Sequence, residues 1–401
     1  MSRNFIYLDN AATTPMYKEA ADKMYEVMNE CYGNPSAVYS LASKSKKILM
    51  DARRTIAATL NAKPEEIFFT SGGTESDNWA LSGTAEALSG KGRHIITLNT
   101  EHHAILNTTK HLEKLGVKIT YLKVDQQGFA DVSNLKRVIT PDTILISAAL
   151  ANNEIGTIQP VKELAALAHE RGILFHTDAV QAYGHIPIDV KAMGIDMLSA
   201  SAHKFGGPKG VGFLYIKAGL EIANLIYGGG QERNHRSGTE NVPGIAAMAV
   251  AAELSTSTIN ERIESEGKLR DYLVKRITNE LPLVTLNGPK PDPEKLTRLP
   301  NNASLLFKYA DSESIVIMMD MAGIAVSGGS ACSSGSVDPS HVISAIGVNH
   351  NDVKSVVRFS LGRDTTKKDI DNAVDALIKI VNKLRSMSVP YKQYMAANKL
   401  K

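Results

Sequence analysis

The feature that most constrains the fold is a series of short β-rich segments that alternate with helical patterns between residues 66 and 217. These segments are IFFTS, HIITL, KITYLKV, TILISAAL, ILFHTD, MLSASA and GVGFLYI. Such alternation predicts a mainly parallel sheet covered by helices. One intervening segment, residues 161–172, has apolar residues at helical spacing and ends in a glycine suited to a C-cap. We therefore expect a large α/β domain over residues 16–258.

The pattern changes after residue 258. An apolar helix is expected over residues 244–254 and a strongly charged helix over residues 260–281. Short strand-like segments then alternate with two helical patterns; the strand-like segments are LVTLNG, NNASLLFKY, IAVSGG and SVVRFSLG. We expect a smaller α+β domain, formed by residues 1–15 and 259–401, and a ligand site in the cleft between the two domains.

Composition excludes several classes of protein. The chain has 401 residues, of which 43% are hydrophobic and 22% charged, as in a soluble globular protein. Its formal charge of +3 is too small to predict direct binding of nucleic acid. No apolar segment is long enough to span a bilayer and the first residues lack a signal pattern, so we expect no membrane partner and a cytoplasmic location. Two cysteines, Cys31 and Cys332, form no disulfide framework and suit a reducing compartment.

Two glycine-containing segments follow expected strands. In SASAHKFGGPKG, Lys204 could form an imine with an aldehyde cofactor, and the alternative is a surface lysine at a strand end. In FFTSGGTESDN, the glycines precede a helix whose free N–H groups could bind a phosphate. The alternative there is that Thr74 is simply an N-cap, with Asp77 three residues on.

Polar residues also follow two other expected strands. Asp178 ends ILFHTD, where a buried carboxylate is costly unless it meets a cation such as a pyridinium nitrogen. The competing interpretation is a cap for the next helix. His102, after HIITL, could place its imidazole against a flat ring. His102 and His103 are adjacent and lack the spacing of metal ligands, so we expect no metal site.

Cys332 lies in a segment rich in glycine and serine, IAVSGGSACSSGSVDPSHV. This composition predicts a mobile, exposed loop over about residues 327–340. A free cysteine is more often a small buried hydrophobe, but these flanking residues argue against burial. No lysine or arginine lies nearby in sequence to favour the thiolate.

Together and in this order, the segments resemble fold-type I pyridoxal-phosphate enzymes, specifically the NifS/IscS-type cysteine desulfurases of the class V aminotransferase group. The resemblance covers nearly the whole chain and is carried by YLDNAATTP, GNPS, SGGTESDN, TEHHA, NNEIG, HTDAVQ, SAHKFGGPKG, GGGQERNHRSGT, SGGSACSSGS and RFSLGR. It implies pyridoxal 5'-phosphate as cofactor and removal of sulfur from L-cysteine. The products are L-alanine and a persulfide on Cys332, whose sulfur passes to acceptor proteins for iron–sulfur cluster assembly or tRNA thiolation.

The resemblance also implies roles for individual residues. Lys204 would bind the cofactor and move the Cα proton, His102 would stack on the ring, and Cys332 would take the sulfur; these three are the expected catalytic residues. The expected cofactor-binding residues are Gly73, Thr74, His102, Asn153, Asp178, Gln181, Ser201, His203, Lys204 and Thr239. Asn34 and Arg358 would hold the substrate carboxylate, for which a guanidinium is well suited.

Thr239 matches a phosphate ligand that the family supplies from the neighbouring subunit, which implies a homodimer. A loop of about ten extended residues can reach roughly 30 Å, far enough to carry sulfur from the cofactor to an acceptor. One departure is Tyr39, where related enzymes commonly have histidine, and tyrosine cannot shuttle protons near neutral pH as an imidazole does.

Two alternatives remain at this stage. The chain could be a selenocysteine lyase or another class V aminotransferase, which would share Lys204 and Asp178; transamination does not need Cys332. It could also be a non-catalytic sulfur carrier or scaffold protein that keeps the fold.

Overall fold

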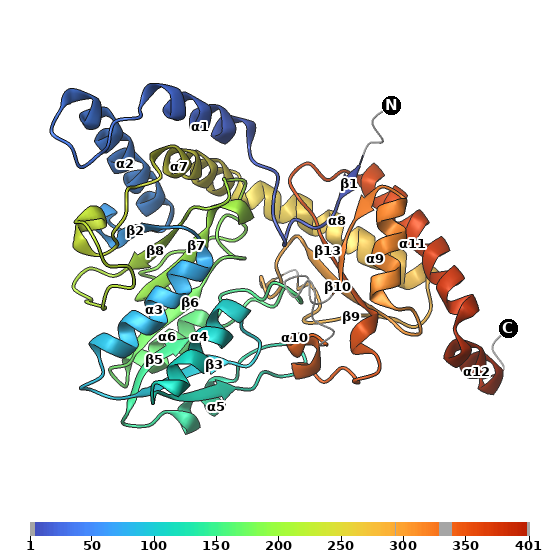
Figure 1. Cartoon of the computed structure of the whole chain (residues 1–401). Helices are drawn as coiled ribbons and strands as arrows, with labels where there is room; N and C mark the ends of the chain where they lie inside the picture. The colour runs from blue at the N-terminus through green and yellow to red at the C-terminus, as the bar shows by residue number, and fades with distance from the viewer. Residues whose placement is uncertain (1–4, 293, 329–338, 399–401) are drawn as a thin grey trace.

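A seven-stranded sheet forms the centre of the larger part of the molecule (Figure 1). The computed structural model describes residues 5–292, 294–328 and 339–398. The sheet has the order β2-β8-β7-β6-β5-β3-β4, and β8 runs antiparallel to both its neighbours while the other pairs are parallel. Its strands are β2 (Ile67–Thr70), β3 (His94–Leu98), β4 (Lys118–Leu122), β5 (Thr143–Ser147), β6 (Leu174–Asp178), β7 (Met197–Ser201) and β8 (Gly212–Ile216). All seven expected strands and the mainly parallel sheet are confirmed.

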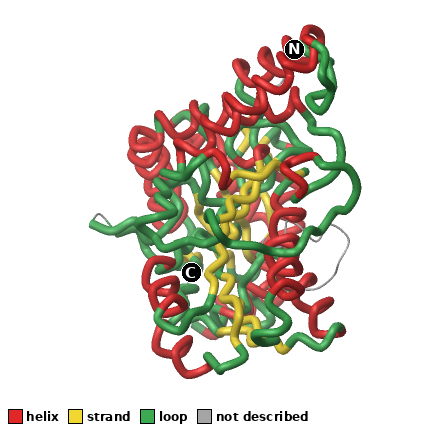
Figure 2. The backbone as a smooth tube through the Cα atoms, turned by 90° about the vertical axis from the view of Figure 1, so that its left-hand side faces the viewer, coloured by secondary structure: helices red, strands yellow, loops and turns green. Residues whose placement is uncertain are grey.

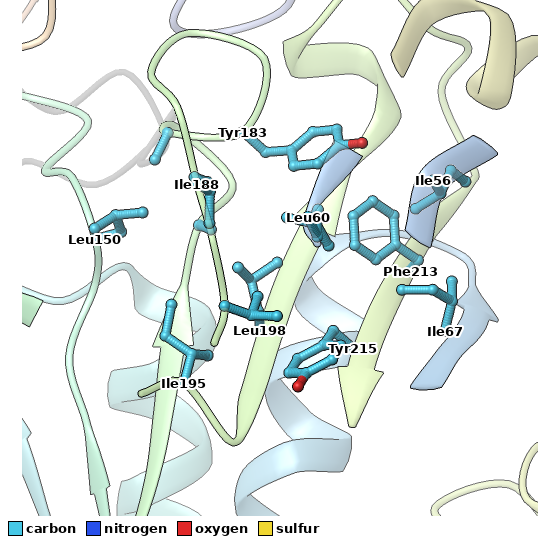
Figure 3. Packing of buried hydrophobic residues seen from close by; sticks show 14 of the residues in the cluster. Ile56, Leu60, Ile67, Leu150, Tyr183, Ile188, Ile195, Leu198, Phe213 and Tyr215 are labelled. Atoms are coloured by element: carbon cyan, nitrogen blue, oxygen red, sulfur yellow. The ribbon is translucent and has the colours of Figure 1, made fainter. Parts of the chain in front are cut away.

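Helices cover both faces of this sheet, so strands run between two helical layers (Figure 2). Successive side chains of a strand point to opposite faces. Phe68 accordingly packs with α3 (Gly73–Ala87) and α4 (His103–Lys114), whereas Ile67 and Phe69 belong to the core shared with helices on the other face. The helices of that second core are α1 (Lys18–Glu30), α2 (Ser40–Thr59), α5 (Val132–Val138), α6 (Val161–His169) and α7 (Val242–Ser257). Figure 3 shows part of this core, in which Ile56 and Phe213 lie side by side and Leu198 is a further member.

Helix α6 is shorter than expected. It ends at His169, and the carbonyl groups of Ala168 and His169 accept hydrogen bonds from Ile173 and Gly172. Gly172 has φ +68°, so the expected glycine turn is present but lies beyond the last helical residue.

The smaller part contains a four-stranded antiparallel sheet in the order β12-β13-β10-β9. Its own hydrophobic core includes Leu273, Phe307 and Phe359. Its strands are β9 (Val284–Leu286), β10 (Asn302–Phe307), β12 (Ser327–Gly328) and β13 (Val356–Ser360). Its helices are α8 (Ile259–Glu280), α9 (Ser312–Met321), α10 (His341–Ala345), α11 (Lys367–Met387) and α12 (Val389–Ala397). The expected charged helix and the expected strands of this part are confirmed.

The N-terminal segment contacts both parts. Strand β1 (Ile6–Tyr7) pairs in parallel with β11 (Ile324–Ala325), and Asp9 forms a bridge with Ser360. A few residues later, the Tyr17 N–H donates to the Gly206 carbonyl of the large part. The domain boundaries at residues 15 and 258 stay a prediction.

Within the described ranges, no single helix is long and apolar enough to cross a membrane. Helices α7 and α8 have the length and composition of a membrane span only when taken together, and they are bent by 69° at their junction.

Candidate active site

A cavity of about 270 Å³ lies at one edge of the large sheet. Strands β2, β3, β5, β6 and β7 all point the same way, so their carboxyl ends meet at this edge, and the loops that follow them line the cavity. This is the usual position of a ligand site in an open α/β sheet. Nine of the expected residues line it: Gly73, Thr74, His102, Asn153, Asp178, Gln181, Ser201, His203 and Lys204.

Three of the expected residues that the structure describes do not line the cavity. Asn34 is exposed, and its side chain accepts a hydrogen bond from the Ser36 N–H at 2.9 Å. Thr239 is exposed, and Arg358 is buried behind the cavity. Cys332 lies outside the described residues, as does most of the loop expected over residues 327–340, so the prediction for that loop is untested.

Lys204 ends a short 3-10 helix, Ala202–Lys204, that directly follows β7. Its Nζ donates hydrogen bonds to the carbonyl oxygens of Ala11 and Ala12, both at 2.8 Å. The Gln181 Nε2 donates to the same Ala11 carbonyl at 2.9 Å. The N-terminal segment therefore contributes main-chain acceptors that hold the lysine amine at the cavity.

Asp178 is the last residue of β6 and is 6% exposed. Its Oδ1 accepts a hydrogen bond from the Val180 N–H at 2.8 Å, and 180–185 is a turn rather than a helix, so the interpretation of Asp178 as a helix cap is wrong. Burial raises the pKa of this carboxyl to about 6, while its Val180 hydrogen bond and the Lys204 charge oppose the shift. A cation placed beside it would favour the carboxylate.

Two further acids, which the sequence did not single out as site residues, lie near Asp178, and one of them, Asp77, lines the cavity. Asp77 on α3 and Glu101 after β3 are both buried. Burial, with the Asp178 charge next, raises the pKa of Asp77 well above its usual value. Burial also raises the pKa of Glu101 to about 8, although its Oε1 accepts from the Ala149 N–H at 2.8 Å. Glu101 therefore keeps its proton near neutral pH and ionises after Asp178.

The turn before α3 suits a phosphate group. Its N-cap, Gly72, has no side chain to bond the first N–H groups of the helix, and Gly73 and Thr74 line the cavity. A Cβ on Gly73 would come within 2.5 Å of the Val180 Cγ2, so only glycine leaves this approach open. The interpretation of Thr74 as N-cap is wrong, because the helix begins at Gly73.

Two imidazoles border the cavity. His102 is the N-cap of α4, and its Nδ1 accepts from the Ala104 N–H at 3.1 Å, so the proton of the neutral ring sits on Nε2. Burial lowers its pKa to about 4, with Lys204 as the next cause. Burial likewise lowers the pKa of His203 to about 4, and its Nδ1 lies 3.1 Å from the Thr13 hydroxyl. Both rings are therefore neutral near pH 7.

Arg358, on β13, connects the smaller part to the cavity. It is 2% exposed; its Nη1 donates to the carbonyl of Asn153 at 2.8 Å and its Nη2 lies 2.9 Å from Asp9 Oδ1. Its Nε has no hydrogen-bond partner among the described residues. The described residues contain no cluster of three or more His, Cys, Asp or Glu side chains that could hold a metal ion.

This arrangement of an amine, a buried carboxylate, a flat neutral imidazole and an uncapped helix start fits pyridoxal 5'-phosphate, and the comparisons agree. The family model of class-V aminotransferases matches residues 6–373, and the chain belongs to this family. It is a pyridoxal-phosphate-dependent enzyme.

Individual relatives narrow the class further. The chain is 50% identical over 394 residues to the cysteine desulfurase IscS of Dictyoglomus turgidum. The matched region covers 98% of each of the two chains. A solved NifS-like protein is 36% identical with a TM-score of 0.88 and covers 94% of this chain and 99% of its own. SspA, solved in complex with cysteine, is 35% identical with a TM-score of 0.78 and covers 89% of this chain and 98% of its own.

Proposed function

We propose that the chain is a pyridoxal-phosphate-dependent cysteine desulfurase, which transfers the sulfur of L-cysteine to its own Cys332 and releases L-alanine. The observation that carries the proposal is one cavity in which the Lys204 amine and the buried Asp178 carboxylate meet beside an uncapped helix start. Similarity to IscS over nearly the full length, and to a protein solved with cysteine, supports this reaction over other class V reactions.

Pyridoxal phosphate, when bound, supplies an aldehyde that links to a lysine and a ring that accepts electrons from the substrate carbon. Lys204 would provide the amine for that link and would then move the proton at the substrate Cα. Asp178 would pair with the ring nitrogen, and Gln181 would donate to the ring oxygen. The first N–H groups of α3 would hold the phosphate, together with the side chains of Ser201, Thr74 and His203, and Asn153 would contact the ring.

His102 would stack on the ring without adding charge, because burial lowers its pKa to about 4. Its Nε2 carries the ring proton and can donate a hydrogen bond to the substrate or the ring. Arg358 and Asn34 would hold the substrate carboxylate, the role that the resemblance implies for them. Arg358 is the nearer of the two to the cavity, because its Nη1 donates to the carbonyl of Asn153, which lines it.

The Cys332 thiolate attacks the sulfur of the substrate. A new S–S bond forms on Cys332 while the C–S bond of the substrate breaks, and the electron pair left on the substrate carbon takes up a proton to give alanine. The sulfur then moves to an acceptor protein, such as an iron–sulfur scaffold or a tRNA-thiolation relay. We place the enzyme in the cytoplasm, which is supported by a sequence with only two cysteines, too few for a disulfide framework.

A homodimer completes the phosphate site in this proposal. Thr239 lies outside the cavity of its own chain, which agrees with a residue that serves a neighbouring site.

Large apolar side chains are also exposed together at the end of α1 and in the segment after it: Tyr25, Met28, Tyr32, Val38 and Tyr39. A patch of this kind on one stretch of chain is typical of an interface, and a second copy is the partner we propose for it.

The direct test is incubation of the purified holoenzyme with L-cysteine and a reductant. Sulfide and alanine should form in equal amounts, and pyruvate from an amino donor without sulfide would show another class V reaction. L-Selenocysteine in place of cysteine tests the lyase alternative, and a protein that never acquires the cofactor absorbance would be a non-catalytic carrier.

Two variants separate the roles of the catalytic residues. Cys332→Ser should keep the cofactor absorbance and lose sulfide release. Lys204→Ala should form no persulfide on Cys332, and a normal level of persulfide on this variant would contradict the roles assigned here. Light scattering of wild type and Val38→Asp tests the dimer; a monomeric wild type would refute it.

A further inference from the structure

A buried chain of polar side chains leads from helix α8 to the main chain of Lys204. The Lys204 carbonyl oxygen lies 2.9 Å from His185 Nε2, and His185 Nδ1 lies 3.2 Å from Arg262 Nη2. The Arg262 Nε lies 3.0 Å from Glu266 Oε1, one helical turn further along α8. None of these contacts belongs to the cavity in which we place the cofactor.

Only one protonation pattern satisfies both contacts of the imidazole. A guanidinium is always charged and only donates hydrogen bonds, so His185 Nδ1 must accept from Arg262. The proton of the neutral ring is then on Nε2, from which it is donated to the Lys204 carbonyl. Burial, with the Arg262 charge next, lowers the pKa of His185 to about 3, which keeps the ring neutral. Arg262 therefore selects the tautomer that can hold Lys204.

Arg262 is itself held in place. Its side chain is 12% exposed and that of Glu266 is 3% exposed, and Arg262 Nη1 also donates to the Gly184 carbonyl at 2.8 Å. Gly184 has φ +77°, and a Cβ there would come within 2.7 Å of the Phe205 Cβ. The turn that carries His185 thus packs directly against the residue after Lys204.

Open space borders one side of the lysine. A second cavity, of about 200 Å³, is lined by Lys204, Phe205, His185 and Arg262. On this side the hydrogen bond from His185 adds a directional restraint on the Lys204 carbonyl.

We propose that His185, Arg262 and Glu266 are positioning residues, which fix the main chain of Lys204 and so hold its amine in line with the substrate Cα. Since Lys204 acts on the substrate only if the proposed function holds, this assignment rests on that function. Helix α8 continues from Arg262 to Leu273, in the core of the smaller part, so the lysine is anchored to that part of the molecule.

Two isosteric replacements of His185 provide the test in the holoenzyme. The glutamine Nε2 of His185→Gln occupies about the position of the imidazole Nε2 and can still donate to Lys204. The amide of His185→Asn reaches only as far as Nδ1, so it can accept from Arg262 but not reach Lys204. We expect His185→Gln to stay within about twofold of wild type, and His185→Asn to lose roughly tenfold in kcat with little change in KM. Arg262→Gln should resemble His185→Asn.

A second measurement is the pH titration of the absorbance band of the bound cofactor, which reports the environment of the lysine linkage. Its midpoint should move by roughly half a pH unit or more in His185→Asn and Arg262→Gln, but not in His185→Gln. Equal activity of the two His185 variants, or equal loss of thermal stability with no movement of the titration, would overturn the proposal.

A further test uses the wild-type protein and so does not depend on whether a variant folds. Nitrogen-15 NMR of the histidine rings should show His185 protonated on Nε2 alone, and a proton on Nδ1 would overturn the proposal. The titration and the NMR experiment do not require sulfide release. A holoenzyme that binds the cofactor but releases no sulfide would therefore refute the proposed function and leave this assignment to be decided by these two measurements.

Discussion

Glu101→Gln should make the free energy of unfolding less sensitive to rising pH. Glu101 is fully buried, its Oε2 has no partner among the described residues, and its pKa is raised from 4.5 to about 8. Between these two values the folded protein holds a proton that the unfolded chain has released. The unfolded state then binds fewer protons, so the free energy of unfolding falls as pH rises, from near 4.5 up to near 8. A glutamine has nearly the same shape and no proton to lose.

The size of the effect follows from one proton. Each pH unit in this window changes the free energy of unfolding by about 1.4 kcal/mol, so wild type should lose roughly 2.5 kcal/mol more than Glu101→Gln between pH 5.5 and 7.5. Urea unfolding of the cofactor-free proteins, followed by circular dichroism at one protein concentration, measures this difference. Glu86→Gln, on the exposed face of α3, is the matched control and should follow wild type. Parallel pH profiles for wild type and Glu101→Gln would show that Glu101 is ionised in the folded protein and refute the reasoning.

Three further substitutions test other parts of the structure. Gly73→Ala should weaken cofactor binding by roughly tenfold in an absorbance titration, because the new methyl group would meet Val180 Cγ2 at 2.5 Å. Asp178→Asn should bind the cofactor but lower kcat by roughly a hundredfold or more, since it removes the charge that pairs with the ring nitrogen; a steady-state rate near wild type would contradict that pairing. Arg53→Ala should cost about 3 kcal/mol in urea unfolding, because it leaves Glu232, 3% exposed and now 2.6 Å from Arg53, as a buried charge without its partner.

The strands of the large sheet were predictable because each is a short apolar run bounded by turn residues. Their parallel direction brings Gly73, His102, Asp178 and Lys204 to one edge of the sheet. The first and last of these residues, 73 and 204, are 131 positions apart in sequence. Local pattern placed these residues at strand ends, but their roles came from the resemblance to a known family, and the site was expected between the two domains rather than at this edge of the sheet.

Other parts of the site depend on tertiary contacts that no local pattern contains. The carbonyl groups of Ala11 and Ala12 bind Lys204 through main-chain atoms, which any residue could supply. Asp77 and Glu101 are ordinary acids in sequence, and their raised pKa values arise from burial beside Asp178. The start of α3 at Gly73 and the end of α6 at His169 were missed because helix ends depend on how neighbouring turns pack.

The pairing of the N-terminal segment has a consequence for biosynthesis. Ile6 pairs with Ile324 and Asp9 with Ser360, so the first strand waits for partners that the ribosome makes more than 300 residues later. The large sheet can form during translation, but the acceptors that hold Lys204 reach their place only when this long-range pairing closes. Capture of the cofactor in its final geometry is therefore a late event, one that waits for the synthesis of both parts of the molecule.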